Sequence, residues 1–194
     1  SATGELNGRP AWWYATRDGE LSLRIGQLRD PRIGLEDVGV SPQPHGFAFT
    51  AAMTTVRADA ATTQLEVSVR ATDFVVRLPV EVTDSAPDPV SQDETHRVAG
   101  TVDLAALLGF LPANEQAVDL KLAVTADDGT VVRRGLSLAA DESALGRLRP
   151  VTGTRDGLTQ VLVPGVTFNL CNVTLSSEIF TEDAHRYLER LRRL

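Results

Sequence analysis

The sequence predicts an all-β protein: an antiparallel β-sandwich, immunoglobulin-like or jelly-roll-like, with an α-helix at its C-terminal end. Three observations carry this prediction. Hydrophobic residues alternate with polar ones in many short stretches, which is the period of a strand with one buried face. Turn-forming dipeptides such as Asp-Gly separate these stretches. Helical periodicity is sustained only in the last residues of the chain, so strands must form the core.

The clearest pair of strands lies in residues 118–139. Every second residue from Leu120 to Val124 is apolar, and the residues between are Lys121 and Ala123. An Asp-Asp-Gly tripeptide at 127–129 interrupts this pattern with residues that tolerate a positive φ. A second β-branched stretch follows, so we expect an antiparallel hairpin. Because an isolated hairpin is only marginally stable in water, other strands must cover its apolar face.

The remaining strands follow from the same alternation and are expected, in chain order, at residues 11–16, 21–25, 46–56, 64–70, 74–82, 158–163 and 166–175. The first two form a hairpin around Asp18-Gly19. Pro79 interrupts the run at 74–82, and because proline donates no backbone hydrogen bond, this run is predicted to be an edge or bulged strand. Residues 30–44 are rich in proline and glycine and are predicted to be a loop with short extended pieces.

Two helices are expected. Asp103 is a suitable N-cap for one or two helical turns over residues 103–108, which Gly109 then ends. Residues 184–194 form the longer helix, with Leu188, Leu191 and Leu194 on one face, acidic residues near its start and arginines near its end. The acidic stretch at 84–94 is predicted to be an exposed loop.

This pattern divides the chain into a flexible lead-in (1–10), a β-sandwich domain (11–177) and a C-terminal amphipathic helix or connector (178–194). Residues 15–23 resemble residues 153–161, because both contain Thr-Arg-Asp-Gly followed by alternating residues. The resemblance has two interpretations: a common turn sequence that recurs by chance, or a repeated unit of a tandem array.

Composition excludes several classes of function. The 194 residues have a net charge of −7, whereas nucleic-acid-binding domains usually present a basic face, so no nucleic-acid partner is expected. No apolar run approaches the roughly 18 residues of a membrane span. Cys171, the single cysteine, cannot form an internal disulfide, and its apolar neighbours predict a buried thiol. Ser1 opens a polar stretch without the features of a signal peptide, which is typical of a trimmed chain.

A family resemblance rests on a series of short motifs in a fixed order: Val102-Asp103-Leu104-Ala105-Ala106-Leu107, Val118-Asp119-Leu120-Lys121-Leu122, Asp128-Gly129-Thr130, Arg133-Arg134, Arg149-Pro150-Val151 and Thr154-Arg155-Asp156-Gly157. Together they resemble a β-sandwich accessory module of actinobacterial glycosyltransferases, similar to the modules attached to CDP-glycerol-type polyol-phosphate transferases that build teichoic-acid-like polymers. The resemblance covers residues 12–175. It implies a non-catalytic module, with catalysis in a separate α/β domain. It also implies a cytoplasmic location, peripheral to the membrane through the full-length protein.

Neither a catalytic centre nor a cofactor site is predicted. His45, His96 and His185 are expected in a loop, at the edge of the acidic loop and in the terminal helix, and none has a nucleophile or a zinc-type partner at a suitable spacing. The best inorganic candidate is calcium, which binds clusters of carboxylates in loops. The candidate ligands are Asp84, Asp88, Asp127 and Asp128, although no calcium-loop motif accompanies them.

The aromatic run Trp12-Trp13-Tyr14 is the candidate binding site. On a strand, Trp12 and Tyr14 share one face and Trp13 lies on the other. One side therefore packs inward, while the opposite side either stacks on a sugar or is covered by a neighbouring domain of the same polypeptide.

Three functions remain open. The first is a non-catalytic module of a bacterial cell-envelope glycosyltransferase or polyol-phosphate transferase that serves positioning or interaction. The second is a carbohydrate-binding module that uses an exposed tryptophan and loop carboxylates to bind a cell-wall glycan or polymer. The third, least favoured, is an enzyme in its own right. An exposed tryptophan on a flat face would favour the second, and a large uncovered apolar patch the first.

Overall fold

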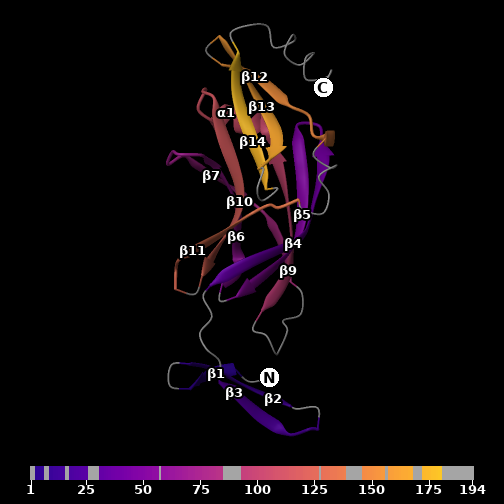
Figure 1. Cartoon of the computed structure of the whole chain (residues 1–194), viewed down its shortest axis with the longest axis vertical. Helices are drawn as coiled ribbons and strands as arrows, with labels where there is room; N and C mark the ends of the chain where they lie inside the picture. The colour runs from indigo at the N-terminus through magenta and orange to yellow at the C-terminus, as the bar shows by residue number, and fades with distance from the viewer. Residues whose placement is uncertain are drawn as a thin grey trace.

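The computed structural model describes residues 3–6, 9–15, 18–25, 31–56, 58–84, 93–126, 128–138, 146–155, 157–167 and 172–180. Within these ranges the chain forms antiparallel strands and one short α-helix, which confirms the predicted all-β class and its sandwich-like arrangement (Figure 1). The strands are β1 (Thr3–Leu6), β2 (Arg9–Ala15), β3 (Leu21–Ile25), β4 (Arg32–Gln43), β5 (Gly46–Val56), β6 (Ala58–Val69), β7 (Val75–Pro79), β8 (Glu81–Asp84), β9 (Glu94–Asp103), β10 (Gln116–Ala126), β11 (Val131–Gly135), β12 (Val151–Arg155), β13 (Leu158–Val166) and β14 (Val173–Phe180). The helix, α1, spans Leu104–Phe110.

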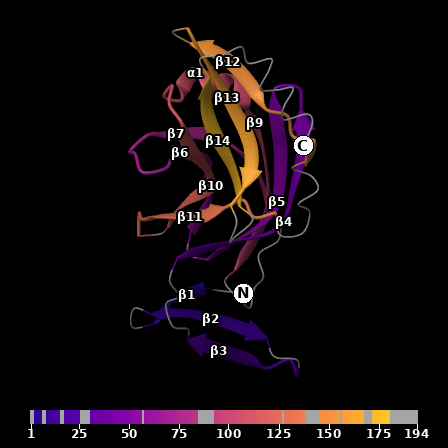
Figure 2. The same cartoon turned by 45° about the horizontal axis from the view of Figure 1, so that its top comes forward.

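Two sheets make up the sandwich. The larger has seven strands, in the order β12-β13-β14-β10-β6-β7, with β11 also paired to β10. Strand β10 pairs with β6 along one side, while β14 and then β11 pair with successive parts of its other side. The smaller sheet has the order β4-β5-β9-β8. Figures 1 and 2 show β4 and β5 along one side of the molecule and β6, β10 and β14 along the other.

The core lies between these sheets because both present an apolar face inward. Phe47, Phe49 and Met53 of β5 are at most 1% exposed, as are Leu65 of β6 and Leu120 of β10. They belong to one continuous cluster of buried hydrophobic residues. The alternation seen in the sequence therefore maps directly onto inward and outward faces.

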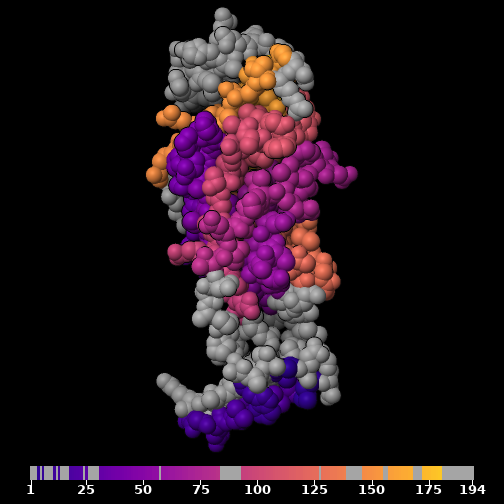
Figure 3. Space-filling model, turned by 180° about the vertical axis from the view of Figure 1, so that it is seen from behind, coloured from indigo at the N-terminus to yellow at the C-terminus, as the bar shows by residue number. Residues whose placement is uncertain are grey.

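A third, three-stranded sheet consists of β1, β2 and β3. Figures 1 and 3 show this sheet, in indigo, at one end of the molecule, beyond the ends of the sandwich strands. Residues 3–6 and 9–10, within the predicted lead-in, belong to β1 and β2. The division into 1–10, 11–177 and 178–194 stays a prediction, and β14 continues beyond residue 177 to Phe180.

Several local predictions are confirmed. The central hairpin forms from β10 and β11, and Gly129 in its turn has a φ of 83°. Asp103 caps α1 through a hydrogen bond that its Oδ1 accepts from the N–H of Ala106. The edge position predicted for the run at 74–82 is found in β7, which ends at Pro79; the run does not continue as one strand, because β8 follows it in the smaller sheet.

Other local predictions are wrong. Residues 32–43, predicted as a loop with short extended pieces, form the continuous edge strand β4, in which a bulge near Asp37 (φ 51°) absorbs the irregularity. His96 is not a solvated loop residue; it is buried in β9, where its Nε2 lies 3.4 Å from Oγ1 of Thr55. The last strand is shifted, because β14 begins at Val173 instead of Val166. The terminal helix, Cys171 and His185 lie outside the described residues.

None of the described helices is long and apolar enough to cross a bilayer.

Candidate functional site

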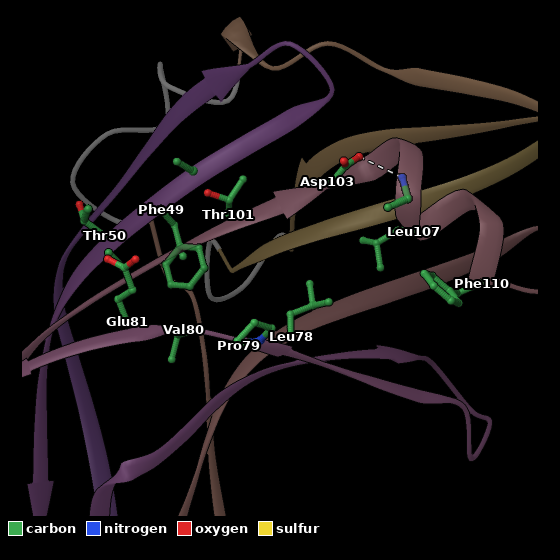
Figure 4. Close-up of a pocket in the computed structure, with 14 residues that line it drawn as sticks. Phe49, Thr50, Leu78, Pro79, Val80, Glu81, Thr101, Asp103, Leu107 and Phe110 are labelled. Carbon is green, nitrogen blue, oxygen red and sulfur yellow. Dashed lines mark hydrogen bonds between the residues drawn. The ribbon is translucent and has the colours of Figure 1, made fainter.

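A groove with a volume of about 520 Å³ opens on the flank of the sandwich. It is lined mostly by apolar side chains from β5, β7, β9 and α1 and from the segment that joins β7 to β8. Figure 4 shows it running from Thr50 and Glu81 at one end to Phe110 at the other. The lining residues are Ala48, Phe49, Thr50, Leu78, Pro79, Val80, Glu81, Ala99, Gly100, Thr101, Asp103, Ala106, Leu107 and Phe110.

The groove exists because the chain changes sheets beside it. Strand β7 is the edge of the larger sheet, β8 is the edge of the smaller one, and Val80 alone separates them. The crossing forms one wall. Pro79 ends β7 at this point, where a missing backbone donor does not interrupt a ladder.

Phe49 forms the floor of the groove, and Gly100 makes room for it. The two residues are cross-strand partners in β5 and β9. A Cβ built on Gly100 would lie 2.7 Å from Cε1 of the Phe49 ring and 3.3 Å from Cγ1 of Val80. Because a Cβ almost never lies this close to another heavy atom, a larger residue at position 100 would displace the Phe49 ring from its place over β9.

Helix α1 closes the other end. The N–H of Leu104 donates to the carbonyl of His45 (2.8 Å), which ties the start of the helix to the turn before β5. Leu104 and Leu107 are buried, whereas the side chain of Phe110 is 63% exposed at the mouth of the groove. Most large aromatic side chains bury more of their surface, so Phe110 is available to a ligand.

The groove has four polar side chains among its apolar lining residues. Thr50, Thr101 and Glu81 line it, and the carboxylate of Asp103 accepts the helix N–H described above. The lining residues include no histidine, serine or cysteine. An apolar cleft with a few polar groups is the usual form of a small-ligand site.

A smaller hollow of about 400 Å³ lies between α1 and the β12–β13 hairpin. Gln160, which is 2% exposed, donates through Nε2 to the carbonyl of Pro112 (3.0 Å) and to Oγ of Ser177 (2.7 Å). Ser177 in turn donates to the carbonyl of Asn114. This buried network fixes the loop after α1.

The predicted aromatic run lies far along the chain from the groove, on β2. Trp13 is 44% exposed, and the alternation of the strand places Trp12 and Tyr14 on the opposite face. The side chains of Trp12 and Tyr14 lie outside the described part of the structure. Whether these three residues bind a sugar or a partner stays a prediction.

Trp13 belongs to a larger apolar face. The register pairs Trp13 with Leu23, Ala11 with Ile25 and Ala15 with Leu21, and the same face of β1 carries Leu6. Leu6, Trp13, Leu21, Leu23 and Ile25 are 38–71% exposed, and we call this set the N-terminal apolar face.

Of the four calcium candidates, only Asp128 has its side chain in the described part of the structure, so calcium binding stays a prediction. Asp128 is exposed at the β10–β11 turn, where its Oδ1 accepts hydrogen bonds from the N–H and hydroxyl of Thr130. Asp84 ends β8, and its side chain, like Asp88 and Asp127, lies outside the described residues. Among the described residues, no three His, Cys, Asp or Glu side chains are grouped as a metal ion requires.

Two clusters of ion pairs lie on the outer face of the larger sheet. Burial raises the pKa of Glu66, but the hydrogen bonds and charges of Arg133 and Arg77 outweigh it, so the pKa is lowered overall. The pKa of Asp119 is also lowered, because Arg70 and then Lys121 outweigh its burial. The hydrogen bond and charge of Asp119 raise the pKa of Arg70 in turn.

The sequence predicts the structural roles of two residues that line the groove, but it does not predict that a groove forms. Pro79 and Asp103 were recognised as an edge-strand residue and a helix cap, and both line it. Phe49, Gly100 and Phe110 were missed, because only the pairing of β5 with β9 and the crossing at Val80 bring them together.

Comparisons with known proteins give only a structural likeness. No protein-family model and no curated protein matches the chain. A crystal structure of residues 217–571 of S. aureus TarS aligns with a TM-score of 0.52 at 12% identity, over 93% of this chain and 47% of that one. A second crystal structure of S. aureus TarS aligns with a TM-score of 0.46 at 14% identity, over 93% of this chain and 29% of that one.

The chain therefore spans about half the length of the TarS segment that it matches. At this level of identity the likeness extends to the fold, and the site residues of the two proteins cannot be equated.

Proposed function

We propose that this chain is a non-catalytic β-sandwich module of a bacterial cell-envelope glycosyltransferase or polyol-phosphate transferase. Its role is to position the enzyme by docking against a neighbouring domain of the same polypeptide, in the cytoplasm at the membrane periphery. The N-terminal apolar face carries this proposal.

The composition of that face supports docking over sugar binding. It presents one aromatic and four aliphatic side chains, all at least 38% exposed. Sugar-binding faces need polar groups beside the aromatic ring, whereas adjoining aliphatic residues in water are typical of protein interfaces. Leaving five large apolar side chains in contact with water is unfavourable, since burying each one contributes roughly 1.5–3 kcal/mol.

The structural likeness is consistent with this proposal. This chain aligns with about half of one segment of S. aureus TarS, and the likeness is one of fold. A module that covers part of a larger enzyme needs a surface that contacts the rest.

The proposal predicts that the N-terminal apolar face is covered in the natural full-length polypeptide. Hydrogen–deuterium exchange is compared between residues 1–194 alone and the longest natural polypeptide that contains them. The amides of β2 and β3 should exchange at least about tenfold more slowly in the longer protein, because docking suppresses local opening. Leu23→Asp should abolish this protection.

Val131→Asp is the matched control, because Val131 is 42% exposed on β11, in another sheet, and should leave the protection unchanged. Equal exchange in the two proteins, or a natural polypeptide without a transferase domain, would contradict the proposal.

The groove supports carbohydrate binding as a second function. Phe110 offers an exposed ring, and Glu81, Thr50 and Thr101 supply hydrogen-bonding groups along the same cleft. Apolar ring faces and hydroxyl groups of a sugar require this combination of stacking and polar contacts. In this second proposal the sugar binds in the groove, whereas the sequence predicts a sugar site at Trp12 or Trp13.

Phe110→Ala is therefore expected to weaken binding of a cell-wall glycan about tenfold, the loss of roughly one aromatic contact. Isothermal titration of a panel of cell-wall oligosaccharides measures this. Trp13→Ala is the control and should bind as the parent does. Binding that is lost in Trp13→Ala and kept in Phe110→Ala would return the site to the aromatic run.

A further inference from the structure

The smaller hollow combines a buried polar side chain with uncharged walls. Its volume of about 400 Å³ lies in the range of small-ligand pockets, roughly 300–1,000 Å³. Its walls are one face of α1, the segment Thr152, Gly153 and Thr154 of β12, and Gln160 of β13. Figures 1 and 2 show these three elements together at one end of the sandwich. None of the lining residues is charged.

The hydrogen bonds of Gln160 show which end of its side-chain amide is the acceptor. The atom at the Nε2 position lies within hydrogen-bond distance of the Pro112 carbonyl and of Oγ of Ser177. A carbonyl oxygen can only accept, and the Ser177 hydroxyl already donates to the carbonyl of Asn114, so both contacts require a nitrogen here. Both protons of this nitrogen are then used, and Oε1 is the acceptor that remains.

Oε1 of Gln160 has no hydrogen-bond partner among the described residues, although the residue is only 2% exposed. The atom is not sealed from solvent, so a molecule in the hollow can reach it. An unpaired acceptor on so buried a residue is unfavourable, and a bound donor removes this cost. Because the walls carry no charge, a neutral N–H or O–H group fits better than a cation, which would lose its hydration without gaining a counter-charge.

The same hollow reaches the open edge of the larger sheet. Strand β12 is the last strand of that sheet and, in the described part of the chain, pairs only with β13. Successive side chains of a strand point to opposite faces, yet Thr152, Gly153 and Thr154 all line the hollow, so the hollow extends around the outer edge of β12. At such an edge every second residue directs its backbone N–H and C=O away from the sheet, where they can pair with another strand.

Gly153 provides the space beside the Gln160 amide. The two residues are cross-strand partners, so their side-chain positions lie on the same face of the hairpin. A Cβ at Gly153 would lie 3.2 Å from Cδ1 of Leu108 in α1, so even a methyl group would press against the helix. A glycine at this position therefore keeps the hollow open between the strand and the helix.

Other edge strands of the sandwich carry features that discourage pairing with a further strand. Strand β7 ends at Pro79, β4 contains Pro42 and the bulge near Asp37, and β8 carries Glu81. Prolines, bulges and charged side chains are the usual protection of a sheet edge. Residues 152–154 have none of these features, so this edge is open to another strand.

We propose that the open edge of β12 binds an extended peptide segment of a partner protein as an additional strand, with one side chain of that segment in the hollow. This side chain is asparagine, glutamine or serine, whose N–H or O–H donates to Oε1 of Gln160. In binding of this kind, main-chain hydrogen bonds supply affinity and pockets for alternate side chains supply specificity. The edge at residues 152–154 and the hollow beside it meet these two requirements.

The peptide site is separate from the surfaces proposed above. It shares no residue with the N-terminal apolar face or with the groove. Docking to a neighbouring domain can therefore fail while peptide binding holds, and the reverse also applies. A small neutral ligand would use the hollow and Gln160 but would leave the edge of β12 unpaired, and the experiment distinguishes the two.

The probe is the peptide Thr-Val-Thr-Asn-Thr-Val-Thr, labelled with fluorescein at its N-terminus and amidated at its C-terminus, and fluorescence polarisation measures its binding to residues 1–194. Replacing the central asparagine with leucine or aspartate, neither of which can donate to Oε1 at neutral pH, should weaken binding at least about tenfold. Hydrogen–deuterium exchange measures pairing with the edge. Saturating asparagine peptide should slow exchange of the outward-facing amides of residues 152–154 at least about tenfold.

Ala105→Leu narrows the hollow from an exposed position of α1, and leucine preserves the helix. It should weaken binding of the asparagine peptide at least about tenfold. Gly109→Leu should do the same, because a Cβ at Gly109 would meet no atom within 4 Å and the fold can accept it. Ala106→Leu is the matched control: Ala106 is exposed on the same helix but lines the groove, so this variant should bind like the parent.

Equal weakening by Ala105→Leu and Ala106→Leu would overturn the proposal. So would a leucine peptide that binds as tightly as the asparagine peptide, or an asparagine peptide that does not bind. Binding without slower exchange in β12 would identify a ligand of the hollow alone and would overturn it as well.

Discussion

Gly46→Ala is expected to destabilise the protein by more than about 3 kcal/mol, because among the described glycines an added methyl group would make its closest contact here. A Cβ on Gly46 would lie 1.9 Å from the carbonyl oxygen of Val102 and 3.1 Å from the backbone nitrogen of Leu104. Both are main-chain atoms and cannot rotate away, so β5 must separate from β9 at the start of α1. Urea unfolding followed by circular dichroism measures the loss.

Gly109→Ala is the control for this prediction. Gly109 lies in α1, and a Cβ there would meet no atom within 4 Å. Because alanine favours a helix by about 1 kcal/mol relative to glycine, this variant should be as stable as the parent or slightly more so. A Gly46→Ala protein with an unchanged unfolding midpoint would show that the turn at His45 adjusts freely.

Phe49→Ala is expected to cost about 3–5 kcal/mol, the range for removing a buried phenylalanine ring. Phe49 is 1% exposed and forms the floor of the groove, so its loss both leaves a cavity and deepens the cleft. Thermal unfolding measures the stability, and binding of a small aromatic dye measures the enlarged cleft.

Gly100 supplies an internal check, because its role is to admit the Phe49 ring. Gly100→Ala alone should cost about 1–3 kcal/mol through overpacking. Combined with Phe49→Ala it should cost almost nothing further, since the added methyl group then enters vacant space. Additive costs in the double variant would mean that Gly100 has another function.

The sequence predicts most accurately the strand segments whose inward-facing residues all pack into the same core. Strands β6 and β10 lie in the interior of the larger sheet, and over residues 65–69 and 118–122 every second residue is apolar and packs into the core. Outside these segments a register shift between Ala123 and Thr125 interrupts the alternation. The Asp-Gly turns and the Asp103 cap are predicted equally well, because hydrogen bonds between residues two or three positions apart determine them.

Strand β4 was missed because its irregularity is tolerated only by its position. It is the edge of the smaller sheet and pairs with β5 alone, so Pro42 and a bulge near Asp37 interrupt no second ladder. A sequence pattern alone cannot distinguish such an edge strand from a loop.

His96 was misplaced for a related reason. Its acidic neighbours indicated an exposed loop, yet β9 pairs with both β5 and β8, which buries the ring against Thr55.

By itself the sequence determined the fold class, the central hairpin and the short capped helix, because these depend on periodicity and on interactions between near neighbours. Tertiary structure alone decided the groove, the N-terminal apolar face and the two clusters of ion pairs on the outer face of the larger sheet. Each of these combines residues that are far apart in the chain, and a one-residue change in strand register would turn their side chains to the opposite face. The surfaces that we propose for function are therefore properties of strand pairing, which alternation in the sequence does not specify.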